Sequence, residues 1–502
     1  MKKSPIDRMM KYRRQTEPHP SCAAGGFTLV EMMVSVALVL LMMLLFTEIF
    51  QIASNSITAQ RGLSENDQRA RMLTTLVQAD LDKRTFQNVI PLHPTLDDSL
   101  ISDALSARRG YLMISENDPD NDADDLIQFT VDASITTQLL DTTPYFGKAT
   151  VLGGTITSAG KLPELVHPNQ PETDDAKISA DNTSQSPYAE ICYFMRGGNL
   201  YRRILLIRKP LDLETTITTQ PVASQDPALL PGTVTDGLSF FNPVNGLYSG
   251  NFWDDFDFSA FRFSSIPYAT FHDVNSFNNS STPPATFPLG RPQHRFGYNH
   301  LTGLPREYVD DSTGTAQFIG RFTHQETSDP DFLYPQANST VGGGSNPMNP
   351  SSSPLEFDNA RNVVSQYASG LRRAEDLVLS NVLSFDIKLF DQAAGQFVDI
   401  GSATAVDYQT SATPDYHNDN PNSTTFARNI FDTWHVDLDI DNADSDNDNT
   451  TGEDLPPFSP VNGSGVRIPL SAIQITIRYR DISSQQIRQM TIIQPLRHLV
   501  ED

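Results

Sequence analysis

The chain has 502 residues, of which 36 are Lys or Arg and 61 are Asp or Glu, so its formal charge is −25. An acidic balance of this size argues against a nucleic-acid-binding surface, since phosphate binding needs clustered Lys and Arg side chains. The hydrophobic content of 38% excludes a disordered chain and a protein with many membrane spans, and 2 cysteines cannot build a disulfide framework.

The amino terminus combines a basic segment with an apolar one. Residues 1–26 are polar and carry six Lys or Arg residues against two acidic residues. Residues 27–46 follow, and the only polar members of these 20 residues are Thr28, Glu31 and Ser35. A helix of this length spans roughly 30 Å, the thickness of the hydrocarbon core of a bilayer. The basic flank predicts a single span with the first 26 residues in the cytoplasm.

Glu31 distinguishes this span from a plain membrane anchor. A carboxylate at the centre of a membrane helix costs roughly 2.5–3.5 kcal/mol, and such residues are usually functional. Cleavage after Gly26 would create a charged amine at Phe27, about 6 Å from Glu31 along a helix, and the two charges could then pair. A cleaved secretory signal peptide and an uncleaved anchor are the competing interpretations. The first lacks a good cleavage site, and the second leaves Glu31 unexplained.

The segment Gly26-Phe27-Thr28-Leu29-Val30-Glu31 and the apolar helix after it resemble the signal of type IV pilins and type II secretion pseudopilins. The resemblance implies that a prepilin peptidase cleaves between Gly26 and Phe27, that Phe27 is N-methylated, and that Glu31 acts in subunit docking. The implied partners are this peptidase, other major and minor pilins or pseudopilins, and an inner-membrane assembly platform. The implied location is the inner membrane, with the carboxyl-terminal domain in the periplasm and, after assembly, in a filament.

The predicted helix continues beyond the span, because no proline occurs between residues 47 and 90. Apolar residues recur there at helical spacing and form one stripe: Leu63, Ala70, Leu73, Val77 and Leu81. Charged residues, Asp80 and Asp82 among them, are expected on the remaining surface, and Gly62 favours a break or bend. We therefore predict a helix over residues 27–86 whose second half packs on a globular domain.

Strand patterns dominate from about residue 110. The strongest signal is a hairpin, in which Tyr188–Met195 and Leu200–Ile207 flank a turn with two glycines that accept positive φ. Leu377–Phe390 carries a strand signal, since Phe385, Ile387 and Leu389 alternate with polar residues in it. Further strands are predicted at Gly110–Ile114, Leu126–Val131, Phe397–Ile400, residues 473–480 and residues 487–493.

These elements predict an α+β fold, in which a long amino-terminal helix, transmembrane in its first half, packs on an antiparallel β-sheet domain. The hairpin and the later strands are similar to those of J-type minor pseudopilins and W-type minor pilins. Residues 210–354 hold 16 of the 34 prolines together with many aromatic residues, which predicts a large irregular insertion whose aromatics pack in a core. The predicted parts are a leader (1–26), the helix (27–86), the β-rich domain in two pieces (87–209 and 375–502) and the insertion (210–374).

Two stretches of alternating Asp residues are candidate cation sites. The first contains Asp118, Asp120, Asp122 and Asp124, and the second contains Asp437, Asp439, Asp441, Asp444, Asp446 and Asp448. Alternating carboxylates suit Ca²⁺, which takes six to eight oxygen ligands. Neither stretch fits the EF-hand template, because Ala123 and Asn449 stand where it requires glycine. Acidic surface turns are the alternative interpretation, so calcium is the only cofactor that the sequence offers.

Catalytic motifs are scarce. The 10 histidines are scattered, and HExxH, GxSxG, phosphate-loop and paired-cysteine motifs do not occur. Cys192 lies in an apolar strand pattern, which favours a buried small hydrophobe. The sequence therefore predicts a non-enzymatic subunit, a minor pseudopilin or minor pilin. The alternative is a periplasmic binding protein or enzyme tethered to the membrane by a single span.

Overall fold

The structure is a computed structural model of the full chain. It describes residues 26–87, 89–90, 109–116, 121–135, 141–148, 183–207, 256–261, 270–272, 289–290, 295–296, 298–299, 304–305, 308–310, 316–318, 356–358, 363–366, 377–408, 430–433, 460, 468–481 and 485–496. The chain divides into two compact units, Met1–Arg61 and Gly62–Asp502.

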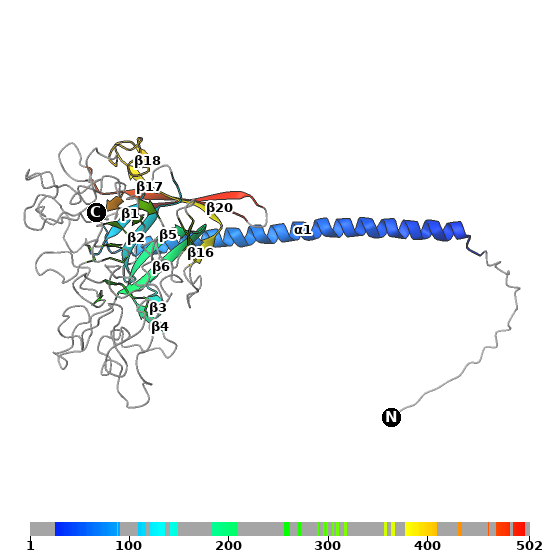
Figure 1. Ribbon diagram of the computed structural model, residues 1–502, viewed down its shortest axis with the longest axis horizontal. Helices are drawn as coiled ribbons and strands as arrows, with labels where there is room; N and C mark the ends of the chain where they lie inside the picture. The colour runs from blue at the N-terminus through cyan, green and yellow to red at the C-terminus, as the bar shows by residue number, and fades with distance from the viewer. Residues whose placement is uncertain are drawn as a thin grey trace, which may run out of the picture. The chain divides into compact units, whose positions relative to one another are not determined.

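The amino-terminal helix α1 runs from Leu29 to Asp82 over 54 residues (Figure 1). It begins two residues later and ends four residues earlier than predicted, and it continues through Gly62 without a break. Its segment Leu29–Ser54 is long and apolar enough to cross a membrane, and it is the only such helix among the described residues. The apolar segment therefore extends beyond the predicted end at residue 46.

The two parts of α1 bury their side chains differently. In the first unit, apolar side chains all round the helix are exposed, among them Leu29 at 77% and Phe50 at 75%. In the second unit, Leu73, Val77 and Leu81 are buried in the hydrophobic core. A helix that is apolar all round needs a membrane or other helices around it, whereas a single apolar stripe suits packing on a sheet. The predicted stripe is thus confirmed for these three residues.

Two antiparallel sheets form the main body of the second unit (Figure 1). The six-stranded sheet has the order β16 (Leu377–Ser380), β6 (Asn199–Ile207), β5 (Tyr188–Arg196), β2 (Leu126–Asp132), β1 (Leu112–Ser115) and β19 (Ile430–Asp432). The four-stranded sheet has the order β18 (Gln396–Val398), β17 (Val382–Asp391), β20 (Ala472–Arg480) and β21 (Ile487–Pro495). Together with α1 they confirm the predicted α+β class.

The predicted central hairpin is confirmed. Strands β5 and β6 pair in register from Tyr188 opposite Ile207 to Arg196 opposite Asn199. Gly197 and Gly198 form the turn at φ values of 54° and 74°. Glycine adopts this left-handed conformation without a steric penalty, so the two-residue loop closes tightly.

The strand signal over Leu377–Phe390 corresponds to two strands, β16 and β17. The run divides at Asn381, which has a φ of 57°, and its two parts belong to different sheets. Strand β16 pairs with β6, whereas β17 pairs with β20. Asn tolerates the left-handed conformation better than most residues, so it can turn the chain here. Its carbonyl accepts a hydrogen bond from the Arg480 amide at 2.8 Å, which fixes the crossing point.

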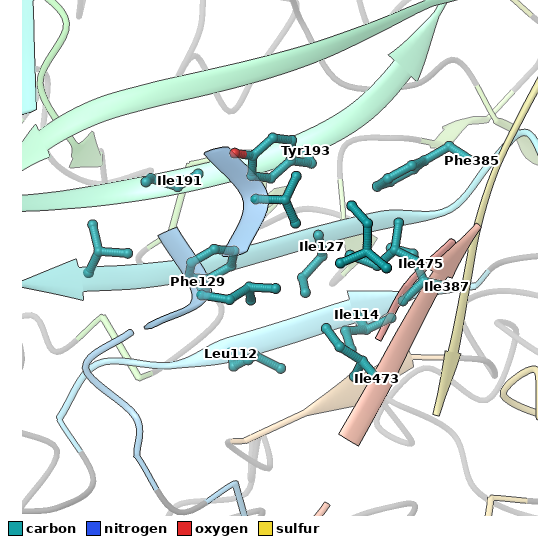
Figure 2. Close-up of a cluster of buried hydrophobic side chains, with 14 of the residues drawn as sticks. Leu112, Ile114, Ile127, Phe129, Ile191, Tyr193, Phe385, Ile387, Ile473 and Ile475 are labelled. Carbon is teal, nitrogen blue, oxygen red and sulfur yellow. The ribbon is translucent and has the colours of Figure 1, made fainter. Parts of the chain in front are cut away.

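Both sheets contribute to one hydrophobic core, and Figure 2 shows its centre. Burial of a large apolar side chain contributes about 1.5–3 kcal/mol, so this cluster is the main attachment between the sheets and α1. Its labelled members are Leu112, Ile114, Ile127, Phe129, Ile191, Tyr193, Phe385, Ile387, Ile473 and Ile475.

The remaining strands are short. They form two-stranded sheets: β3 (Tyr145–Lys148) with β4 (Thr183–Ser186), β8 (Ala260–Phe261) with β9 (Thr270–Phe271), β10 (Tyr298–Asn299) with β11 (Leu304–Pro305), β12 (Tyr308–Asp310) with β13 (Ala316–Phe318), and β14 (Glu356–Asp358) with β15 (Val363–Gln366). Phe256 and Phe258 are buried in the core, as predicted for aromatics of this region. Most of residues 210–374 lie outside the described residues, so the insertion stays a prediction.

Candidate functional site

The first turn of α1 is closed by Thr28 and Glu31. The Thr28 amide donates to Glu31 Oε2 at 3.0 Å, and the Glu31 amide donates to Thr28 Oγ1 at 3.3 Å. The Thr28 hydroxyl also donates to Glu31 Oε2 at 3.1 Å. This reciprocal arrangement is a capping box, which satisfies backbone amides that have no partner within the helix. Glu31 therefore has a local structural role as a cap of the first turn.

The predicted cleavage site lies directly before this turn. Gly26 and Phe27 are exposed and precede the first helical residue, Leu29. A peptide bond outside a helix is open to a peptidase, because its backbone is not engaged in helical hydrogen bonds. The Glu31 carboxylate is turned toward Thr28, the neighbour of Phe27. Cleavage and N-methylation at Phe27 and docking through Glu31 remain predictions.

The other end of α1 is fixed by a buried ion pair that the sequence did not predict. Asp80 was expected on the surface, yet it is only 2% exposed, and Asp82 is buried as well. Arg202 binds both oxygens of Asp80, from Nε at 2.7 Å and from Nη2 at 2.8 Å. The Tyr193 hydroxyl donates to Asp80 Oδ2 at 2.5 Å. Since Arg202 and Tyr193 lie on β6 and β5, this pair joins the helix to the central hairpin.

The position of Asp80 in the sequence could have predicted that its side chain is buried. Asp80 follows Val77 by three residues and precedes Leu81, and both neighbours belong to the apolar stripe. A residue at this spacing lies on the same face of the helix. A charged side chain within an apolar stripe predicts a buried partner of opposite charge.

Acidic side chains also meet where the two sheets adjoin. Ser115 of β1 pairs with Leu126 of β2, so the next pair in the same antiparallel register is Glu116 opposite Asp125. Both residues are buried, at 2% and 1% exposure. The amide of Ile387 on β17 donates to Asp125 Oδ2 at 2.6 Å. The β17 amide thus holds Asp125 beside the four-stranded sheet, and Glu116 lies near enough to Asp125 for the two acidic groups to repel each other.

Further carboxylates surround this pair. Lys388 contacts Asp386 at 3.2 Å and forms a shorter ion pair with Asp399. Burial is the largest cause that raises the pKa of Glu116 to about 9; repulsion by Asp399, Asp386 and Asp124 contributes to this rise, against an opposite effect of Lys388. Burial likewise raises the pKa of Asp386 to about 6. Burial and mutual repulsion thus favour the protonated forms of Glu116 and Asp386 compared with exposed carboxyl groups.

Only two of the predicted calcium ligands, Asp122 and Asp124, lie among the described residues. Asp122 is partly exposed and lies 3.3 Å from Arg478 Nη1, whereas Asp124 is buried. The others lie outside the described residues: Asp118, Asp120, Asp437, Asp439, Asp441, Asp444, Asp446 and Asp448. Within the described part of the chain, no three Asp, Glu, His or Cys side chains already form a metal-binding arrangement. Calcium binding by these stretches stays a prediction.

Three residues of types that often act in catalysis, Cys192, Ser259 and His272, are buried in the fold. Cys192 is buried, as predicted. The hydroxyl of Ser259 and Nδ1 of His272 are 2.8 Å apart, but both residues are fully buried. A substrate cannot reach a serine in such a place, so this pair supports packing rather than nucleophilic catalysis.

No family model matches the chain, and neither the curated proteins nor the solved structures give a match. The structure establishes a single amino-terminal apolar helix of the kind that a pilin-like signal anchor requires. The same helix enters an α+β domain made of antiparallel sheets.

Proposed function

We propose that the protein is a minor pseudopilin or minor pilin, a non-catalytic subunit of a type II secretion pseudopilus or a type IV pilus. One observation carries the proposal. An exposed Gly26-Phe27 bond stands immediately before an apolar helix whose first turn contains Glu31. The capping box would also serve an uncleaved anchor, but a processed subunit in addition gains a terminal amine close to the Glu31 carboxylate, which explains a charge in the apolar segment.

The exposed apolar surface of α1 supports the proposal. Residues 29–54 suit a bilayer, and the same side chains suit packing against the helices of other subunits after extraction from the membrane. Because Leu73, Val77 and Leu81 fix the end of this helix in the core, a movement of the helix is transmitted to the β-rich domain. A filament subunit needs this mechanical connection.

The proposed location follows from the processing reaction. The leader, residues 1–26, faces the cytoplasm, where prepilin peptidase acts, and the domain after the span faces the periplasm. The proposed partners are this peptidase, the inner-membrane assembly platform and other pilin-like subunits.

Mass spectrometry of the amino terminus tests the processing step. In cells that contain the peptidase, we expect the mature chain to begin at a methylated Phe27. A chain that retains Met1 would refute the proposal and leave the alternative of a membrane-tethered periplasmic binding protein or enzyme.

Two substitutions at one position separate the capping role of Glu31 from its role in docking. Glu31→Gln keeps the capping box, because glutamine can accept the same hydrogen bond, but it removes the charge. Glu31→Ala removes both. If the charge pairs with the Phe27 amine of a neighbouring subunit, both variants should be cleaved yet fail to co-purify with the assembled complex. Normal assembly of Glu31→Gln would show that Glu31 serves only as a cap.

A further inference from the structure

Strand β21 forms one edge of the four-stranded sheet, and it is much longer than the other edges of the two main sheets. It has 9 residues, whereas β16 has 4 and β18 and β19 have 3 each. A strand at an edge presents a row of unpaired amides and carbonyls, and proteins usually keep such edges short or block them with charged residues or proline. A long open edge is therefore a place where another strand can pair.

The hydrogen bonds between β20 and β21 show which backbone groups point outward. The Leu496 amide donates to the Ser471 carbonyl at 2.8 Å, just beyond the strand ends, and the register continues from there without a bulge. In an antiparallel pair, every second residue bonds to the partner strand, and the residues between point their amides and carbonyls away from it. The outward residues of β21 are therefore Ile487, Gln489, Thr491 and Ile493.

Two further observations support this direction. The Arg480 amide, opposite Ile487, donates to the Asn381 carbonyl at 2.8 Å and so points away from β21. The four outward residues are all exposed, Ile487 at 61% and Ile493 at 54%. No strand among the described residues pairs with their outward side, so this row of backbone groups is open.

The side chains beside the edge define what it can bind. Residues directly opposite each other on paired strands share a face, and Arg480 lies opposite Ile487. Arg480 is exposed and forms no ion pair within the described part of the chain. The one charged side chain of β21, Arg488, is partly buried and contacts Asp481 at 3.5 Å. The edge thus offers apolar contacts and a free positive charge, on a chain whose net charge is −25.

We propose that β21 is a docking edge, to which an extended segment of another protein adds as a further strand. Strand addition of this kind gains affinity from main-chain hydrogen bonds and specificity from alternate side chains. The segment that fits has apolar side chains opposite Ile487 and Ile493 and polar ones between them. It carries a carboxylate at the end near Arg480. Because the inference concerns only the second unit, it does not rest on the proposed function.

Binding of a synthetic peptide to the full chain in detergent tests the docking edge. The probe is a fluorescent peptide in which valine alternates with threonine and each end carries a glutamate. We expect saturable binding, measured by fluorescence anisotropy, and slower hydrogen exchange of the four outward amides of β21. The same peptide with methylated backbone amides cannot donate main-chain hydrogen bonds, so it should not bind.

Two substitutions at one position separate main-chain pairing from side-chain contact. Thr491→Pro removes an outward amide but no hydrogen bond to β20, so the sheet should stay folded, as near-UV circular dichroism can verify. Peptide binding should nevertheless weaken by about ten-fold or more, since a donor is lost and the proline ring obstructs the edge. Thr491→Val keeps the amide and should bind the peptide as the parent does.

The charge is tested at Arg480. Arg480→Gln should weaken binding about three-fold at low ionic strength, and the difference should disappear in high salt. A probe with lysine in place of glutamate should bind more weakly to the parent. Equal binding of both probes would show that the partner need not be acidic and would contradict that part of the proposal.

Three outcomes would overturn strand addition at β21. The first is absence of peptide binding, and the second is equal binding by the parent and Thr491→Pro. The third is a parent chain that dimerises in detergent while Thr491→Pro is monomeric, which would make a second copy the occupant. None of these measurements depends on cleavage after Gly26, so failure of the proposed function would leave this test unaffected.

Discussion

Asp80 uses both of its carboxylate oxygens inside the fold, although it lies in the second part of α1, where charged residues were expected on the surface outside the apolar stripe. Arg202 and Tyr193 bind it from two neighbouring strands. Removing one member of a buried ion pair leaves the other charge without compensation, which typically costs about 3–5 kcal/mol. We therefore expect Asp80→Asn to lower the free energy of unfolding of the full chain by an amount of this order, as measured by denaturant titration in detergent.

A control on the same network is Tyr193→Phe. It removes one hydrogen bond to Asp80 and keeps the aromatic ring in the core, so its cost should be smaller, about 1–3 kcal/mol. Equal and small effects of both variants, below about 1 kcal/mol, would contradict the role of Asp80 in attaching the helix.

Asp391 holds a loop through three backbone amides. The Ala394 amide donates to its Oδ1 at 2.8 Å, and the Val406 and Asp407 amides donate to its Oδ2 at 2.6 and 2.8 Å. Burial would raise the pKa of Asp391, but these hydrogen bonds outweigh it and lower the pKa below 3.8. A carboxylate with a lowered pKa stabilises the folded state above its ordinary pKa, and the effect is lost as the pH falls through the lowered value.

Hydrogen exchange of the Val406 and Asp407 amides should report this dependence. We expect protection at pH 7 that declines in acid below about pH 4 in the parent protein. Asp391→Asn should show weak protection of both amides at every pH, since the neutral amide is a poorer acceptor. Unchanged protection in the variant would show that other contacts hold the loop.

At the scale of elements, Gly110 lets β1 approach both β2 and the end of α1. It has a φ of +69°, and a Cβ atom there would lie 1.9 Å from Thr130 Oγ1. Thr130 Oγ1 is in turn 2.5 Å from Thr85 Oγ1, which follows the helix. Gly110→Ala should therefore combine backbone strain with overpacking and cost about 2–5 kcal/mol, measured as a loss in the free energy of unfolding.

Gly197→Ala in the β5–β6 turn is the matched control. Gly197 also has a positive φ, of +54°, but no atom lies within 4 Å of an added Cβ. Only the left-handed conformation is then penalised, at about 1–2 kcal/mol. Equal effects at both positions would mean that the close contact at Gly110 relaxes without cost.

At the scale of the whole molecule, the two compact units differ in the surroundings that they need. The unit Gly62–Asp502 contains the buried core, whereas the apolar side chains of the first unit are exposed. A chain that begins at Gly62 should therefore be folded and soluble without detergent, and the full chain should require detergent or lipid. Size-exclusion chromatography and near-UV circular dichroism measure both properties.

A shorter chain that begins at residue 83 provides the contrast. It lacks Leu73, Val77, Leu81 and the buried carboxylate of Asp80, so it should lose the near-UV signal of packed aromatic side chains. Aggregation of the Gly62 chain in the absence of detergent would contradict the division into an apolar anchor and an independently folded domain.

The sequence by itself determined the features that depend on neighbouring residues. The apolar span, the Glu31 position, the helical stripe and the β5–β6 turn are local patterns, because a span needs only length and a tight turn needs only glycine. These patterns were enough to predict the α+β class and the place where the candidate processing site lies.

Only the tertiary structure decided what depends on distant partners. Asp80 is buried because Arg202 is positioned 122 residues away along the chain. Asn381 ends a strand because its two sides pair with different sheets. Glu116 meets Asp125 and Asp386 because two sheets adjoin there. A charge is tolerated in a protein interior only when a partner is positioned by the fold, and hydrophobic periodicity along the sequence carries no information about that partner.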